Sequence, residues 1–185
     1  NTDMWPAYAE KCSVVTFAVT GKPRITYLLP IGYLSYHGMN SAGISCNHNA
    51  LFGSPWRKGL PRFFISRSAM EYCTINEIRN YIAGIDYVAS RHILFADSKG
   101  NTLSCEFDSK AKEFVDQRGG VFVHTNHCLC KKTAAFEKIS VSPQSFETGL
   151  HPAESSIHDD GTSARSALPA PGRHNCIRVQ DFHTY

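Results

Sequence analysis

The segment 123–129, with the sequence VHTNHCL, carries the densest group of chemically capable side chains in the chain. A Gly-Gly pair and a short apolar run precede it, so these side chains are expected at the end of a strand. Alternate residues of a strand face the same side, which places His124 and Asn126 together. An amide held at a strand end could donate an N–H to a developing oxyanion. The alternative is that Asn126 is a buried residue that satisfies a turn.

A second pair of amides, Asn47 and Asn49, stands in the segment 47–51, NHNAL. If this segment is a strand, the two side chains share a face. One of these amides could supply a second oxyanion donor beside Asn126, because neutral donors stabilise negative charge without protonating a nucleophile. An ordinary Asn in a strand-end turn is the alternative for Asn49.

The histidines and cysteines of the segment 124–130 raise the question of a zinc site. Their spacing, His-x-x-His-Cys-x-Cys, matches none of the common zinc patterns. On a strand, His124 and His127 would also point to opposite faces. The chain shows no nucleotide or coenzyme A motif. We therefore expect neither a metal nor an organic cofactor.

The elements that must hold these residues begin with antiparallel strands. The composition and turn residues predict strands at 13–19, 25–29, 33–37 and 43–47, the last two joined by a turn at 38–41. A helix is then expected after Pro61, and a second begins at a capping box formed by Thr74 and Glu77. Further strands are expected at 92–96, 102–107, 112–115 and 121–125. This order predicts an α+β layered domain.

The chain divides into three regions by composition. Residues 1–139 contain the expected strands and helices. Residues 140–172 are rich in Ser, Pro, Gly and His without sustained periodicity, which is typical of a long loop or an insertion. Residues 173–185 read as the start of a further, truncated element, with a helix expected over 177–182.

Bulk properties exclude several classes of function. The net charge is +3, and the Lys and Arg residues form no basic stripe, so no nucleic-acid partner is expected. No apolar run approaches the roughly 20 residues of a membrane helix. Seven irregularly spaced Cys residues indicate reduced thiols rather than a disulfide framework, which is typical of an intracellular protein of the cytoplasm or an organelle.

Three strings in this order resemble one known family. They are GMNSAGI with NHNAL (38–44 and 47–51), VASRHILFAD (88–97) and HTNHCL (124–129). They are similar to the acyl-coenzyme A:6-aminopenicillanic acid acyltransferase family of N-terminal nucleophile amidohydrolases and acyltransferases, and more distantly to the choloylglycine hydrolases. The resemblance covers residues 1–129. It implies a four-layer αββα sandwich, of which residues 1–139 would form the central part.

The resemblance also implies roles for single residues. Asp3 would orient the α-amino group of the nucleophile, and a carboxylate suits this task because it can hold an amine in place. Asn49 and Asn126 would be the oxyanion donors, with Asn49 favoured over Asn47 by the choloylglycine hydrolases. Four residues are expected to support the site or bind substrate, namely Asn47, Ser90, His124 and Arg173. Arg165 and Arg178 are the other candidates for the family's late active-site Arg.

The family's nucleophile is a Cys that becomes the first residue after self-cleavage, and its own amine serves as the base. It would lie upstream of Asp3, where this chain has no Cys. Cys73-Thr74 imitates the expected pair, but it falls at a helix junction and is expected in the core. The chain is therefore expected to be a fragment that lacks the nucleophile and is inactive alone.

For the complete protein we expect an amide-bond hydrolase or acyltransferase that acts through an acyl-enzyme on the N-terminal Cys. Its partners would be a small acyl amide or acyl thioester substrate and the missing N-terminal segment or subunit, with no nucleic acid or membrane. The alternative is a catalytically inactive binding or scaffold domain of the same fold.

Overall fold

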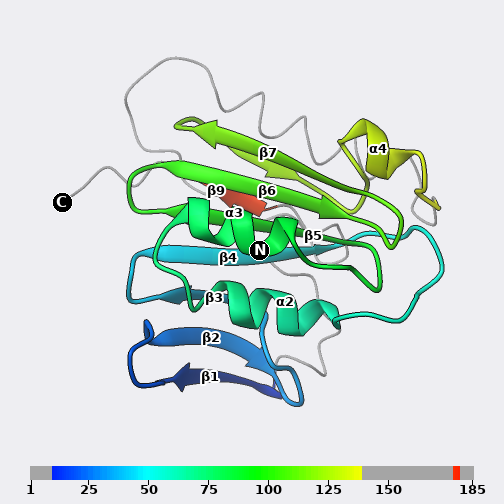
Figure 1. The fold of residues 1–185 in the computed structure, drawn as a ribbon. Coiled ribbons are helices and arrows are strands. Elements are labelled where there is room, and N and C mark those ends of the chain that lie inside the picture. The colour runs from blue at the N-terminus through cyan, green and yellow to red at the C-terminus, as the bar shows by residue number, and fades with distance from the viewer. Residues whose placement is uncertain (1–9, 139–176, 180–185) are drawn as a thin grey trace.

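A single antiparallel sheet organises the computed structural model, which describes residues 10–138 and 177–179. Within these ranges, seven strands lie side by side in sequence order (Figure 1). They are β1 (Cys12–Phe17), β2 (Ile25–Pro30), β3 (His37–Asn40), β4 (Ile44–Ala50), β5 (Arg91–Asp97), β6 (Asn101–Phe107) and β7 (Lys112–Arg118). Hairpins join most neighbours, and the two helices interrupt the order between β4 and β5.

The helices α2 (Arg62–Ala69) and α3 (Ile75–Ala83) cover one face of the sheet (Figure 1). Apolar residues of both helices, among them Ile65, Ile78 and Ile82, form one core with Ile93 and Phe95 of β5. All five side chains are fully buried. Burial of each such side chain contributes about 1.5–3 kcal/mol, so this layer holds the helices on the sheet.

The predicted capping box begins α3. The hydroxyl of Thr74 accepts a hydrogen bond from the Glu77 N–H at 3.2 Å, and Glu77 Oε2 accepts one from the Cys73 N–H at 3.2 Å. Gly84 follows as the C-cap residue. The start of this helix was therefore correctly predicted from local sequence alone.

The opposite face of the central strands is polar. Alternation along β4, β5 and β6 turns Asn49, His92 and Glu106 to this side, and all three are buried. Two short strands, β8 (Phe122–His124) and β9 (Ile177–Val179), form a second sheet, and β9 contacts β4. The helix α4 (Lys131–Ala134) follows β8 and contacts β7. The described part thus stacks helices, a large sheet and a small sheet.

Two predicted elements were wrong. The strand expected at 33–37 begins instead at His37, and the turn expected at 38–41 falls later. The side chain of Asn40 places the turn after residue 40. Its Oδ1 accepts hydrogen bonds from the N–H groups of Ala42 (3.1 Å) and Ile44 (3.0 Å), and Gly43 adopts a φ of +83°.

The helix expected over 177–182 was the second error, because residues 177–179 form β9. These residues pair with β8 in an antiparallel ladder, so pairing with a preceding strand outweighs the local helical tendency. The predicted insertion at 140–172 lies outside the described residues.

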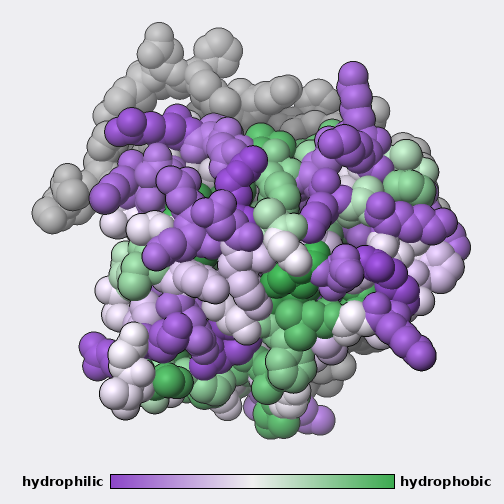
Figure 2. Space-filling view, in the orientation of Figure 1, coloured by the Kyte–Doolittle hydropathy of each residue, from purple (hydrophilic) through white to green (hydrophobic). Residues whose placement is uncertain are grey.

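The helix-bearing face is mostly polar at its surface (Figure 2). Figure 2 shows apolar side chains gathered around α2, where Phe64 is 47% exposed. In residues 10–138 and 177–179, no helix combines the length and the apolar character needed to cross a membrane.

Candidate active site

The two predicted oxyanion donors meet at the end of β4. Asn49 Nδ2 donates to the carbonyl oxygen of His124 at 2.8 Å, and Asn126 Nδ2 donates to the carbonyl oxygen of Ala50 at 3.0 Å. Segments that are 75 or more residues apart in sequence are thereby joined. Each amide has a second N–H, and Asn49 Oδ1 is buried without a hydrogen-bond partner. The structure therefore brings Asn49 and Asn126 together, as a two-donor site requires.

A row of buried polar side chains extends from Asn49 across the sheet. In the strand register, Asn49 lies opposite His92, and His92 lies opposite Glu106. The ring of His124 stacks on that of His92, with centroids 3.5 Å apart and an interplanar angle of 3°. His124 thus connects the small sheet to the polar face of the large one.

Glu106 fastens the segment that carries Asn126. Its carboxylate accepts hydrogen bonds from His124 Nε2 (2.8 Å), the N–H groups of Leu129 (2.7 Å) and Cys130 (3.1 Å), and the Thr133 hydroxyl (2.5 Å). Burial would raise the pKa of Glu106, but the hydrogen bonds from His124, Thr133 and Leu129 outweigh burial and lower the pKa to about 2. Glu106 is therefore an ionised, buried carboxylate.

Both ring nitrogens of His124 have hydrogen-bond partners. Its Nδ1 lies 2.7 Å from the carbonyl oxygen of Thr125 and 3.5 Å from Asn49 Nδ2, and its Nε2 lies 2.8 Å from the Glu106 carboxylate. The ring therefore links the segment that carries Asn126 to both Asn49 and Glu106.

The neighbouring histidine rings are neutral. Burial, together with the charge of His124, lowers the pKa of His92 well below its ordinary value. His92 Nε2 lies 3.0 Å from the Ser104 hydroxyl, while its Nδ1 is buried without a hydrogen-bond partner. Burial and His124 also lower the pKa of His127, whose Nδ1 lies 2.6 Å from the Thr125 hydroxyl.

Ser90 supports the loop that follows β4. Its hydroxyl donates to Asp108 Oδ2 at 2.7 Å, and the N–H of Ser54 donates to the same oxygen at 2.7 Å. A Cβ at Gly53 would lie 2.2 Å from Asp108 Oδ2 and 2.4 Å from Ser90 Oγ, so any larger residue would force the loop or these side chains to shift. Ser90 therefore braces the chain just beyond Asn49.

The other predicted site residues differ in what the structure describes. Asn47 makes a side-chain hydrogen bond with His37 of β3. Asp3, Arg165 and Arg173 lie outside the described residues. The backbone of Arg178 belongs to β9, where it lies opposite Val123.

Four of the described cysteines have thiols that resist ionisation. Burial raises the pKa of Cys46 and Cys105, and it raises the pKa of Cys128 and Cys130 to about 12, with the negative charge of Glu106 adding to the effect in the latter two. A nucleophile needs the opposite shift. These thiols suit packing. Cys73, expected in the core, is instead exposed.

Metal-ligating groups do not gather anywhere in the described part of the chain. There, no three His, Cys, Asp or Glu side chains are placed so that they could hold a metal ion. The cluster around His124 is held by hydrogen bonds between protein groups.

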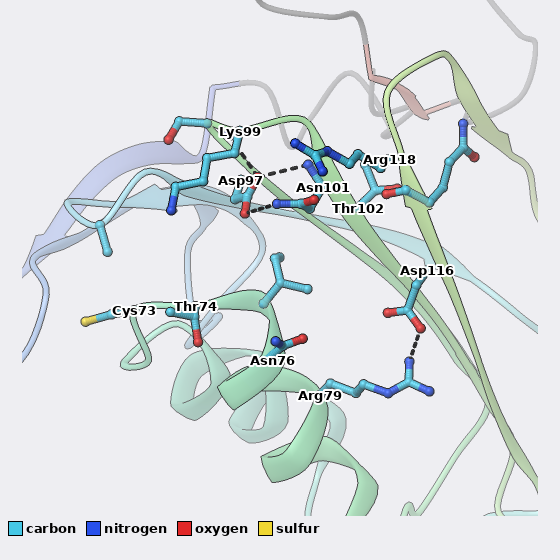
Figure 3. A pocket seen from close by; sticks show the side chains of 14 residues that line it. Cys73, Thr74, Asn76, Arg79, Asp97, Lys99, Asn101, Thr102, Asp116 and Arg118 are labelled. Atoms are coloured by element: carbon cyan, nitrogen blue, oxygen red, sulfur yellow. Dashed lines mark hydrogen bonds and ion pairs between the residues drawn. The ribbon is translucent and has the colours of Figure 1, made fainter.

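A separate groove with a volume of about 720 Å³ lies at the other end of the strands (Figure 3). Asp97 of β5, which lies opposite the first residue of β4, lines it together with Arg79 and Asp116. Figure 3 shows Arg79 directed at Asp116 and Asp97 bonded to Asn101. Both carboxylates are engaged in these contacts, and the groove contains none of the predicted site residues.

Sequence reasoning missed Glu106 as a residue of this cluster. The available signal was a single charged residue between Cys105 and Phe107 in an otherwise uncharged strand. Ionised side chains are seldom fully buried unless they are paired, so such a residue indicates a buried partner.

The chain is similar to known proteins of one family. A model of the acyl-coenzyme A:6-aminopenicillanic acid acyl-transferase family matches residues 1–158. The 40 kDa form of acyl-coenzyme A:6-aminopenicillanic-acid-acyltransferase from Emericella nidulans is 29% identical over 149 residues. The match covers 79% of this chain and 42% of that protein, so the chain spans less than half the length of this curated relative.

Solved structures share the fold. Two crystal structures of variants of the conjugated bile acid hydrolase from Clostridium perfringens each align at 12% identity. One has a TM-score of 0.50 and covers 58% of this chain and 43% of the hydrolase chain. The other has a TM-score of 0.51 and covers 83% and 50%, respectively. The expected fold class, part of an αββα N-terminal nucleophile hydrolase sandwich, is confirmed.

Proposed function

Because the chain belongs to the acyl-coenzyme A:6-aminopenicillanic acid acyltransferase family, we propose that the complete protein is an amide-bond hydrolase or acyltransferase. Its nucleophile is an N-terminal Cys, encoded before Asn1 and exposed by self-cleavage. The substrate is a small molecule that carries an acyl amide or an acyl thioester. The observation that supports the proposal is that Asn49 and Asn126 lie together at the end of β4, where each donates a hydrogen bond to the backbone near the other.

The reaction uses protein groups alone. The α-amino group of the nucleophile takes the thiol proton, and the sulfur attacks the substrate carbonyl carbon. The second N–H of Asn126, together with that of Asn49, stabilises the negative charge on the carbonyl oxygen. The tetrahedral intermediate collapses as the carbon–nitrogen bond breaks and the leaving amine receives the proton. Water or a second amine then attacks the thioester and regenerates the Cys.

Asp3 and Arg173 complete this site in the proposal. Asp3 holds the α-amino group of the nucleophile by a charge-assisted hydrogen bond. Arg173 binds a polar group of the substrate. His124 supports the site from β8 of the second sheet, and Ser90, just before β5, supports the loop after β4 through Asp108. Asn47 lies on the same strand as Asn49.

A catalytically inactive scaffold of the same fold is the competing function. One observation favours it: both amides already donate to backbone carbonyls, which is what purely structural Asn residues would do. The scaffold and the enzyme differ in covalent chemistry, since only the enzyme forms an acyl-enzyme.

An acylating probe on the complete protein separates the two functions. We expect a chromogenic phenylacetyl thioester to label one Cys upstream of Asn1, identified by peptide mass spectrometry. The Cys73→Ser variant is the matched control, because Cys73 is the exposed cysteine within residues 10–138. Labelling that persists in this variant supports the enzyme. Labelling lost with Cys73, or no labelling at all, favours the scaffold.

A further inference from the structure

We propose that Glu106 is a positioning residue that sets the orientation of Asn126 in the active site. Glu106 does not contact the reacting groups. It acts through His124 and through the turn that leads into α4. This inference rests on the proposed role of Asn126 as an oxyanion donor.

The contacts of Glu106 bracket Asn126 in sequence. On the N-terminal side, its Oε1 accepts from His124 Nε2, two residues before Asn126. On the C-terminal side, Oε1 also accepts from the Leu129 N–H, and Oε2 accepts from the Cys130 N–H and the Thr133 hydroxyl. One carboxylate therefore anchors both ends of the short loop that presents Asn126.

The loop has a second, independent attachment to the sheet. Glu106 belongs to β6, whereas the hydrogen bond from Asn126 to the Ala50 carbonyl and the bond from Asn49 to the His124 carbonyl reach β4. β5 lies between these two strands, and its His92 stacks beneath His124. The loop is thus held at two points across three strands, which restricts the orientation of the Asn126 amide.

The geometry requires a carboxylate at residue 106. Four polar groups converge on its two oxygens, namely His124 Nε2, the N–H groups of Leu129 and Cys130, and the Thr133 hydroxyl. Glutamine has one acceptor oxygen, and its NH₂ group would face donors instead of accepting from them. The substitution Glu106→Gln keeps the side-chain shape while it releases at least one anchor of the loop.

Glu113 provides a matched control. It lies opposite Glu106 in the register of β6 and β7, and its carboxylate also accepts from a backbone N–H at the start of α4, that of Lys132 at 2.7 Å. Glu113 does not bond to His124. If Glu106 served only to hold α4, Glu106→Gln and Glu113→Gln should change kcat by the same factor.

The kinetic test is a double-mutant cycle in the complete protein. We expect Glu106→Gln to lower kcat by about 100-fold, as misplacement of a reacting group by roughly 1 Å does, with little change in KM. Glu113→Gln should leave kcat near the wild-type value. In an Asn126→Ala background, Glu106→Gln should lower kcat little further, because the group that it orients is gone. An equal fold-loss in both backgrounds, or an equal loss from Glu113→Gln, would overturn the proposal.

A spectroscopic test does not depend on turnover. The side-chain ¹⁵NH₂ signals of Asn126 are assigned by their disappearance in Asn126→Ala. We expect these signals to shift or broaden in Glu106→Gln and to stay in place in Glu113→Gln. Unchanged Asn126 signals in Glu106→Gln would overturn the positioning role. If Asn126→Ala left turnover intact, the proposed oxyanion role of Asn126 would be wrong. The NMR signals would still show whether Glu106 sets the orientation of the Asn126 side chain.

Discussion

Asn49 and Asn126 are joined by two reciprocal hydrogen bonds. The Asn49 side chain donates to the carbonyl of His124, two residues before Asn126, at 2.8 Å, and the Asn126 side chain donates to the carbonyl of Ala50, next to Asn49, at 3.0 Å. These two hydrogen bonds hold the amide of Asn49, on β4, close to the amide of Asn126, in the loop after β8. Each amide carries a second N–H, and Asn49 Nδ2 also lies 3.5 Å from His124 Nδ1. A preorganised pair of donors costs no reorganisation when charge develops, which is the property that an oxyanion site needs.

The first prediction concerns Asn126→Ala in the complete protein. Loss of one oxyanion donor should lower turnover by about two to three orders of magnitude, with little change in KM. Loss of the hydrogen bond to the Ala50 carbonyl should cost only about 1 kcal/mol of stability. Turnover and thermal unfolding are measured on the same preparation. Asn101→Ala, at the distant start of β6, is the control. A variant that melts several degrees lower but turns over normally would assign Asn126 to the scaffold.

The sequence predicted the local elements well because their signals are local. The start of α3 follows from Thr74 and Glu77, which are three residues apart, and the structure shows both of their hydrogen bonds. The turn before β4 was misplaced because Gly and Asn occur at both candidate positions. The Oδ1 of Asn40 decides between them by accepting two backbone N–H groups, a contact that composition does not reveal.

The site was predictable only as a set of residue types. Asn49 and Asn126 could be selected because amides at strand ends suit an oxyanion. Their meeting depends on the packing of β8 on the large sheet, which no local pattern encodes. Glu106 was missed for the same reason, since its partners, His124 and the 129–133 turn, lie far along the chain.

The second prediction concerns the cap of α3. Thr74→Ala removes the side-chain acceptor of the Glu77 N–H and should lower the free energy of unfolding by about 1 kcal/mol. Thr74→Ser keeps the acceptor and should be close to wild type. Urea unfolding of the three proteins measures the difference. Equal stability of the Ala and Ser variants would show that the cap contributes nothing.

The third prediction concerns metal content. The described residues bring no three metal-ligating side chains together, and the proposed chemistry uses protein groups alone. Elemental analysis of protein purified without a histidine tag should therefore give well under one zinc per chain. A stoichiometric metal that survives dialysis would contradict this prediction.

The fourth prediction concerns Gly53→Ala. The added Cβ would lie 2.2 Å from Asp108 Oδ2 and 2.4 Å from Ser90 Oγ, so the loop or the carboxylate must shift. Such overpacking should cost about 1–3 kcal/mol. Ser90→Ala removes one of the two clashing oxygens, so the double variant should lose less than the sum of the single losses. Strict additivity in urea unfolding would show that the two residues do not share this contact.

The final prediction concerns acid stability. The folded pKa of Glu106 is lowered from 4.5 to about 2, so folding is favoured whenever the carboxylate is ionised. This shift contributes on the order of 3 kcal/mol, fully present above about pH 4.5 and lost as the pH falls towards 2.

The Glu106→Gln variant tests this linkage directly. It should be less stable than wild type at neutral pH, and the difference should shrink as the pH falls from about 5 to 2, because wild type loses this contribution there. Unfolding by urea at each pH measures the difference, with Glu113→Gln as the control that keeps the buried pair with His124. A difference that stays constant between pH 5 and pH 2 would show that the ionisation of Glu106 does not stabilise the fold.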